Sequence, residues 1–297
     1  MQPSMRLHAA GAALLAVLLF SGLDALVKAT TYGTPLALVV FLRYAAGLIF
    51  STSSAAVQGQ LRLSWATIRR AVGRSLAGLC CAVLFFGALK LLPLAQTVAL
   101  TFTSPFFMVM ISAAMLGDPV TRRSLFAAAF GFLGVVVMLA EKLSSEAGSP
   151  LGFAMALASA VAYALSMILS RRDTAHDSVP QMILVQNFIS AMVVLPFALY
   201  WYQPVPGHML MMFLAIGALG TGGNYAITWA YKHAPATLLG PFEFTALIWA
   251  VTFGMVFFAE VPSAHTLLGA VIIIGACLVV VQPIAASVRP RADDSCP

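Results

Sequence analysis

Three charged residues stand inside long apolar stretches of this sequence: Asp24, Arg43 and Glu243. An ionised side chain at the centre of a membrane helix costs about 2.5 to 3.5 kcal/mol on insertion scales, so such residues usually face a partner or a water-filled cavity. The planar guanidinium of Arg43 suits a carboxylate or a phosphate. Glu243 follows Gly240 and Pro241, where a helix can break, and it could exchange a proton or hold a cationic group. These residues predict a site for a small ionic solute.

Asp24 has two interpretations. Lys28 follows it by four residues, so the two side chains can pair along one face of a helix, and Lys28 can also extend to the outer membrane surface. Alternatively, Asp24 closes an outer gate by pairing with Arg43 in one state and parting from it in the other. At the helical rise per residue their predicted depths differ by about 6 Å, which an arginine side chain can bridge.

Uncharged polar residues add further candidates for substrate binding or gating. We select Thr103, Asn187 and Asn224, the two asparagines because a buried amide must find partners away from water. The remaining members of the set are Gln96, Thr97, Thr101, Ser104, Gln186, Thr221 and Tyr225. Because Ser and Thr often bond their own helix backbone, half or more of the whole set should be structural.

Two aromatic residues, Tyr163 and Trp249, lie deep in their apolar stretches. Packing against neighbouring helices and contact with a planar substrate or a gate are both open for them. Trp201 and Tyr202, in contrast, are predicted at the outer end of a helix, where aromatic residues commonly lie at the membrane surface.

The composition determines which elements must position these residues. The 297 residues are 61% hydrophobic and 9% charged, whereas a soluble domain has roughly 25% charged residues. A water-soluble core of this size cannot bury so much apolar surface. A bilayer can, because each spanning helix needs about 20 mainly apolar residues.

Ten apolar segments are long enough to be spanning helices, and turn residues or charges separate them. They are 7–27, 35–56, 73–92, 95–116, 122–140, 150–170, 179–201, 208–230, 236–258 and 265–282. The prediction is therefore an all-α integral membrane protein with ten transmembrane helices.

The distribution of Lys and Arg predicts the orientation of these helices. With the N-terminus inside, 12 of the 16 basic residues fall on the inner side, and Lys28, Lys90 and Lys142 fall outside. Cytoplasmic loops carry such an excess of positive charge. We therefore expect a multi-pass protein of a bacterial-type inner membrane with both termini in the cytoplasm.

The two halves of the chain resemble each other at an offset of 142 residues. Phe102-Thr103 corresponds to Phe244-Thr245, and Asp118 corresponds to Glu260. Because five helices are an odd number, the second copy enters the membrane from the opposite side. Inverted repeats of this kind are typical of alternating-access carriers, with the binding site between the repeats near the membrane midplane.

At this level the chain resembles the drug/metabolite transporter superfamily, EamA type, over nearly its whole length. The residues that carry the resemblance are Phe20 to Lys28, Phe41-Leu42-Arg43-Tyr44, Leu94-Ala95, Thr103-Ser104-Pro105, Gly117-Asp118, Phe242-Glu243-Phe244-Thr245 and Ala259-Glu260-Val261-Pro262. The resemblance implies two inverted five-helix bundles and solute transport, and leaves the solute open. On this basis we expect a first repeat at 1–145, a second at 146–285 and a cytoplasmic tail at 286–297.

The expected function is secondary transport of a small polar metabolite, most simply efflux of an amino acid or an amino-acid derivative, with proton coupling at Glu243. Uptake of a cofactor-like solute such as riboflavin or S-adenosylmethionine is the alternative. A membrane-embedded enzyme is a remote one, since the sequence has no His-Glu-x-x-His motif and no Walker loop. We expect no cofactor, no metal and no nucleic-acid partner, and a monomer or a homodimer.

Overall fold

The computed structural model describes residues 3–61, 64–116, 122–143, 149–173, 177–233 and 242–281, and every regular element in these ranges is a helix. The elements are α1 (Pro3–Thr31), α2 (Leu36–Val57), α3 (Trp65–Leu91), α4 (Leu94–Thr101), α5 (Ser104–Leu116), α6 (Arg122–Leu143), α7 (Pro150–Asp173), α8 (Val179–Tyr200), α9 (Gly207–His233), α11 (Ala246–Phe258) and α12 (Ala264–Val281). The Gly117-Asp118 motif and the predicted break at Gly240-Pro241 lie outside the described residues.

Seven of the helical stretches are long and apolar enough to cross a membrane, and one of them, Leu94–Met115, runs through α4 and α5. Shorter apolar helices occupy Ala129–Met138, Ala246–Phe258 and Ala264–Ala276. The seven long stretches, one of which combines α4 and α5, and the three shorter helices together give ten spans among the described residues. This agrees with the predicted ten-helix membrane protein.

The third helix begins earlier than predicted, at Trp65 instead of residue 73. Ser64 caps its first turn, because the Ser64 hydroxyl oxygen accepts a hydrogen bond from the Thr67 backbone N–H at 3.2 Å. Arg69 and Arg70 therefore belong to the helix. The hydrophobicity pattern missed this stretch because Thr67, Arg69 and Arg70 interrupt its apolar residues.

The two corresponding broken helices meet at the centre of the molecule. In both, a two-residue turn interrupts the helix, at Phe102-Thr103 and at Phe244-Thr245. The Thr103 hydroxyl donates to the Leu100 carbonyl at 2.7 Å, and the Thr245 hydroxyl donates to the Phe242 carbonyl at 2.6 Å. The rings of Phe102 and Phe244 pack edge to face with centroids 5.2 Å apart. Equivalent residues thus touch at the pseudo-two-fold axis.

Helix packing follows the same symmetry. The contact of α1 with α9 corresponds to that of α7 with α3, and the contact of α2 with α9 corresponds to that of α8 with α3. Two pairs join equivalent helices, α2 with α8 and α6 with α12, and α4 packs against α11, which is the counterpart of α5 at the 142-residue offset. The main helix contacts thus follow the arrangement of two inverted five-helix repeats.

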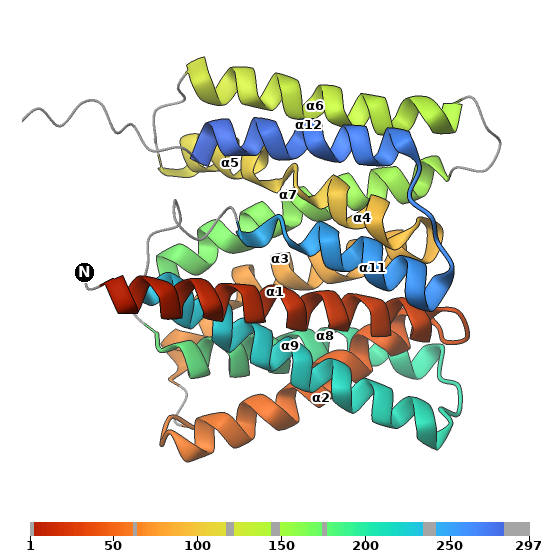
Figure 1. Cartoon of the computed structure of the whole chain (residues 1–297). Coiled ribbons are helices and arrows are strands. Elements are labelled where there is room, and N and C mark those ends of the chain that lie inside the picture. Colours follow the sequence, from red (N-terminus) through yellow and green to blue (C-terminus); the bar gives the residue numbers. More distant parts are fainter. Residues whose placement is uncertain are drawn as a thin grey trace, which may run out of the picture.

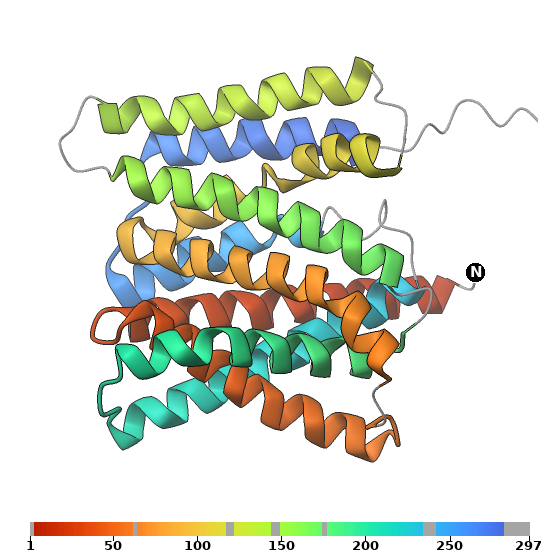
Figure 2. The ribbon, with the colours of Figure 1, turned by 180° about the vertical axis from the view of Figure 1, so that it is seen from behind.

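The helices lie roughly side by side in one bundle, with α6 and α12 along one edge and α2 and α9 along the other (Figures 1 and 2). The start of α1 and the last turn of α12 lie at the same end of the bundle (Figure 1). We call this the amino end and the opposite one the far end. The far end holds the last turns of α1 and α3 and the start of α4.

Close backbone contact between α6 and α12 yields a prediction about stability. A Cβ at Gly269 would lie 2.5 Å from the Met138 Cγ and 2.6 Å from the Gly134 carbonyl oxygen, so Gly269→Val must push the helices apart. We expect a loss of about 1 to 3 kcal/mol, as for other overpacked interiors, seen as a lower melting temperature in detergent. Gly275→Val on the same helix is the control, because nothing lies within 4 Å of its added Cβ. Equal melting temperatures for the two variants would contradict the tight interface.

Candidate functional site

A cluster of polar side chains from both repeats lies at the centre of the bundle. Asp24 of α1, Arg43 of α2 and Cys81 of α3 come from the first repeat, and Tyr163 of α7 and Glu243, just before α11, come from the second. Arg43 interacts electrostatically with Asp24 and with Cys81, and Tyr163 with Cys81 and with Glu243. All five are half-buried. We call these residues the central cluster, and it includes four of the nine residues selected from the sequence.

Arg43 is held by aromatic rings and not by an acid. The carbon of its guanidinium lies 4.5 Å from the Tyr44 ring centroid and 5.5 Å from that of Phe86. Its Nε is buried without a hydrogen-bond acceptor, and no ion pair of Arg43 occurs in the part of the chain that the structure describes. Cation–π contacts stabilise the charge, and the Nε–H donor remains unused. The arrangement can accept a carboxylate or a phosphate.

Asp24 forms an ion pair with neither of its predicted partners, within the ranges the structure covers. It remains close enough to Arg43 for an electrostatic interaction. The predicted Asp24–Arg43 ion pair is therefore absent from this conformation. The alternative partner, Lys28, is engaged elsewhere.

Lys28 does not extend to the membrane surface, as one interpretation expected; its side chain is 1% exposed. Its Nζ lies 2.5 Å from Oε1 of Glu260 and donates to the Leu92 carbonyl at 2.8 Å. The other Glu260 oxygen, Oε2, accepts from the Leu94 backbone N–H at 2.8 Å, at the start of α4. The partial burial of Tyr32 and the nearby Glu260 carboxylate raise the pKa of Tyr32. We call Lys28 and Glu260 the far-end pair.

A cavity of about 150 Å³ adjoins the far-end pair. Glu260, Ser263 and Thr266 line one part of it, and Pro93 and Gln96 line another. Gln96 is 1% exposed, and its amide nitrogen and oxygen are both buried without a hydrogen-bond partner among the described residues.

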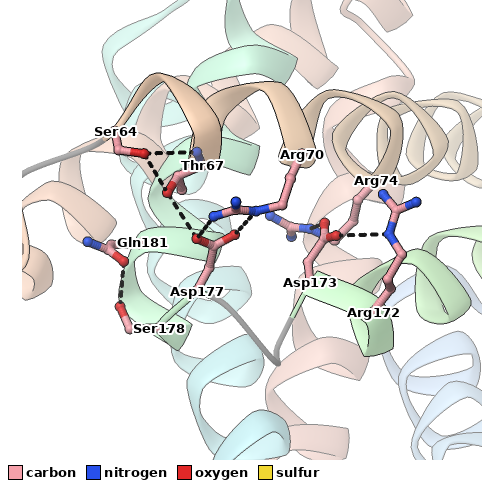
Figure 3. Close-up of polar contacts among 9 residues, drawn as sticks. All are labelled: Ser64, Thr67, Arg70, Arg74, Arg172, Asp173, Asp177, Ser178 and Gln181. Carbon is pink, nitrogen blue, oxygen red and sulfur yellow. Dashed lines mark hydrogen bonds and ion pairs between the residues drawn. The ribbon is translucent and has the colours of Figure 1, made fainter.

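A second charged network lies at the amino end, where α3 meets α7 and the start of α8 (Figure 3). Arg70 pairs with Asp177 at 2.8 Å, and the Thr67 hydroxyl donates to the same carboxylate at 2.9 Å. Arg74 lies 3.5 Å from Asp173, and both side chains are nearly inaccessible to solvent. Arg74 also donates to the Gln186 amide oxygen and to the Met182 carbonyl. These bonds fasten the first repeat to the second.

The other selected residues are placed apart from the central cluster or are bonded within their helices. The Thr103 hydroxyl bonds its own helix at the break, and the Asn224 amide donates to the Gly220 carbonyl at 2.8 Å. The Asn187 amide donates to Ser51 of α2 at 3.2 Å. Trp249 packs against Phe253, with ring centroids 5.9 Å apart. Their contacts describe helix packing, and we leave them out of the proposed site.

Sequence reasoning missed Glu260 as the partner of Lys28. Glu260 stood out only as the repeat counterpart of Asp118. The available signal was that a basic residue at the end of the first helix and an acidic residue after the ninth fall on the same predicted side of the membrane. Cys81 was also missed, because a thiol in an apolar run usually packs as a small apolar side chain.

A membrane bundle of two inverted repeats, with charges from both repeats meeting at its centre, is the architecture of alternating-access transporters. The comparisons with known proteins agree. The chain belongs to the EamA-like transporter family, whose pattern matches residues 8–140 and again 150–282.

Characterised relatives are transporters of different solutes. The chain is 28% identical to the pseudopaline exporter CntI of Pseudomonas aeruginosa, over 90% of this chain and 93% of that protein. It is 27% identical to an S-adenosylmethionine uptake transporter of Rickettsia prowazekii, over 67% of this chain and 69% of that one. It is also 27% identical to a riboflavin transporter of Brucella anthropi, over 84% and 89%. These names point to membrane transporters rather than to enzymes.

A solved crystal structure shares the fold. It matches with a TM-score of 0.65 and 22% sequence identity, over 92% of this chain and 96% of the other. At this identity the match describes the architecture alone.

The amino-end network predicts that two neighbouring acids differ in their effect on stability. Asp173→Asn leaves the charge of Arg74, which is 3% exposed, without a carboxylate, and breaking such a buried pair costs about 3 to 5 kcal/mol. Asp177→Asn affects Arg70, which is 34% exposed and stays hydrated, so the loss should be much smaller. Thermal melting in detergent compares the two. A larger drop for Asp177→Asn would refute this ranking.

Proposed function

We propose that this chain is a secondary transporter that exports an amino acid or an amino-acid-derived compound across the inner membrane, with both termini in the cytoplasm. The central cluster is the binding site. Arg43 anchors the carboxylate of the solute, and Glu243 holds its ammonium group or carries a coupled proton. The observation that supports this most directly is that Arg43 has no ion pair among the described residues and that its buried Nε lacks a hydrogen-bond acceptor.

The distribution of charge in the cluster favours a zwitterion. The cationic group, Arg43, belongs to the first repeat, and the acid Glu243 with its neighbour Tyr163 belongs to the second. A solute with one carboxylate and one ammonium group can therefore bridge the repeats. Binding energy that depends on both repeats can favour the conformations in which the repeats approach each other.

Export is the favoured direction because the pseudopaline exporter aligns with nearly the whole chain. Since the sequence has no Walker loop, transport draws on an ion or solute gradient in this proposal. One chain with two repeats encloses one transport pathway, so a monomer is sufficient for transport in this proposal. In a homodimer each chain would have its own binding site.

Uptake of S-adenosylmethionine is the second candidate. Its methionine portion carries the carboxylate and ammonium groups that Arg43 and Glu243 suit, and a transporter of this solute is among the relatives. Riboflavin has no carboxylate and would leave Arg43 unpaired, so the site argues against it.

Transport by purified protein in proteoliposomes tests the proposal. The solutes are a panel of labelled amino acids, S-adenosylmethionine and riboflavin, with and without an imposed proton gradient. For the transported solute we expect Arg43→Lys to raise the apparent KM about tenfold or more, because a desolvated bidentate pair is worth more than about 1.4 kcal/mol. Arg69→Lys, at an exposed position on α3, is the matched control and should transport normally.

Glu243→Gln separates coupling from binding. If Glu243 carries the proton, the variant still exchanges solute across the membrane but no longer responds to the gradient. If Glu243 binds the ammonium group, exchange itself weakens. Full activity of Arg43→Lys together with an unchanged pH profile of Glu243→Gln would remove the central cluster as the site. Preloaded right-side-out vesicles then report direction, through faster efflux than uptake under the same gradient.

A further inference from the structure

We propose that the far-end pair, Lys28 with Glu260, is the outer gate of the transport pathway and is closed in this conformation. The inference rests on the proposed function, since a gate needs a pathway to close. It concerns the far end of the bundle, which the charge distribution places outside the cell.

The pair joins elements that an outward opening must separate. Lys28 belongs to α1 and bonds the carbonyl of Leu92, between α3 and α4. Glu260 follows α11 in the second repeat and accepts from the N–H of Leu94. One ion pair and two hydrogen bonds therefore tie three segments of both repeats together. The carboxylate also receives the favourable field at the N-terminus of α4.

The position of Lys28 places the pair directly over the central cluster. Lys28 and Asp24 are four residues apart on α1 and so share one helix face. Lys28 is one turn, about 6 Å, closer to the far end. A solute leaving the cluster outward along this face of α1 reaches Lys28 and Glu260 next.

Gln96 indicates that the closed arrangement has an open alternative. Its amide is fully buried beside Glu260 and has no hydrogen-bond partner among the described residues, although it lines the far-end cavity. A buried amide without partners is unfavourable, and opening to solvent would hydrate it. Glu260 and Lys28 hold the gate closed, and Gln96 favours opening.

Cys81 provides a native reporter of the gate. It lies in the central cluster, about ten residues from the far end of α3, and is half-buried. The chain has four cysteines, so replacing Cys80, Cys277 and Cys296 with alanine leaves Cys81 alone. A membrane-impermeant methanethiosulfonate reagent, added outside right-side-out vesicles, then measures access from the outer side without any substrate. Failure of this test is therefore distinguishable from failure of the proposed function.

In this background we expect Glu260→Gln to be labelled about tenfold faster than the parent, the change produced by a shift of about 1.4 kcal/mol in the gate equilibrium. The amide keeps the size of the side chain and removes its charge. Asp177→Asn makes the same chemical change at the amino end and should not increase outer labelling. Equal labelling of the parent and Glu260→Gln, or the same increase in Asp177→Asn, would overturn the proposal.

Gln96→Leu is a second variant that tests the proposal even if Glu260→Gln unfolds. Removing the unpartnered amide stabilises the closed gate, so Cys81 should be labelled more slowly than in the parent, which misfolding cannot produce. Labelling at or above the parent rate would contradict the proposed opposition between Gln96 and the far-end pair.

Discussion

The contact between two broken helices at the pseudo-two-fold axis is the feature on which the rest of the architecture depends. A membrane interior tolerates a helix break only where the freed backbone groups find partners within the protein. Here Thr103 and Thr245 each bond the carbonyl three residues earlier. Their neighbours Phe102 and Phe244 pack ring against ring. The breaks can thus meet in the core, and Glu243, next to one of them, lies close to Tyr163 of α7.

The packing of the helices is symmetric, but the positions of the charged residues are not. At the repeat offset Glu243 corresponds to Thr101, whose hydroxyl bonds its own helix at Val98. The junction of α3 with α7 and α8 has two ion pairs, whereas the corresponding junction near the start of α9 has a contact between Thr34 and Met209. Symmetric packing allows two similar conformations, open to opposite sides. Unequal charges make those conformations differ in energy.

The sequence could predict the features that arise from local composition. Apolar length defined the helices, and the ordered repeat defined the inverted halves and the matching Phe-Thr breaks. The cost of a buried charge identified Arg43, Asp24 and Glu243, and the structure places them in one cluster. The sequence could not predict which residue pairs with Lys28, because Lys28 and Glu260 come together only when both repeats are folded against each other. For Asn187 the sequence signalled a need for partners, but whether solute or a neighbouring helix supplies them depends on packing.

Arg43 shows why the central cluster is better explained by binding than by stability. A buried cation without an acid is among the costlier arrangements in a protein interior, and apolar residues of similar volume often pack as stably as a full ion pair. The rings of Tyr44 and Phe86 reduce this cost through cation–π contacts, and the buried Nε of Arg43 still lacks an acceptor. An Asp24 carboxylate moved into direct contact would stabilise the closed fold further, but it would fill the donors that a solute must use. A site that binds and releases an anion needs its cation stabilised and still available, and the arrangement around Arg43 meets both conditions.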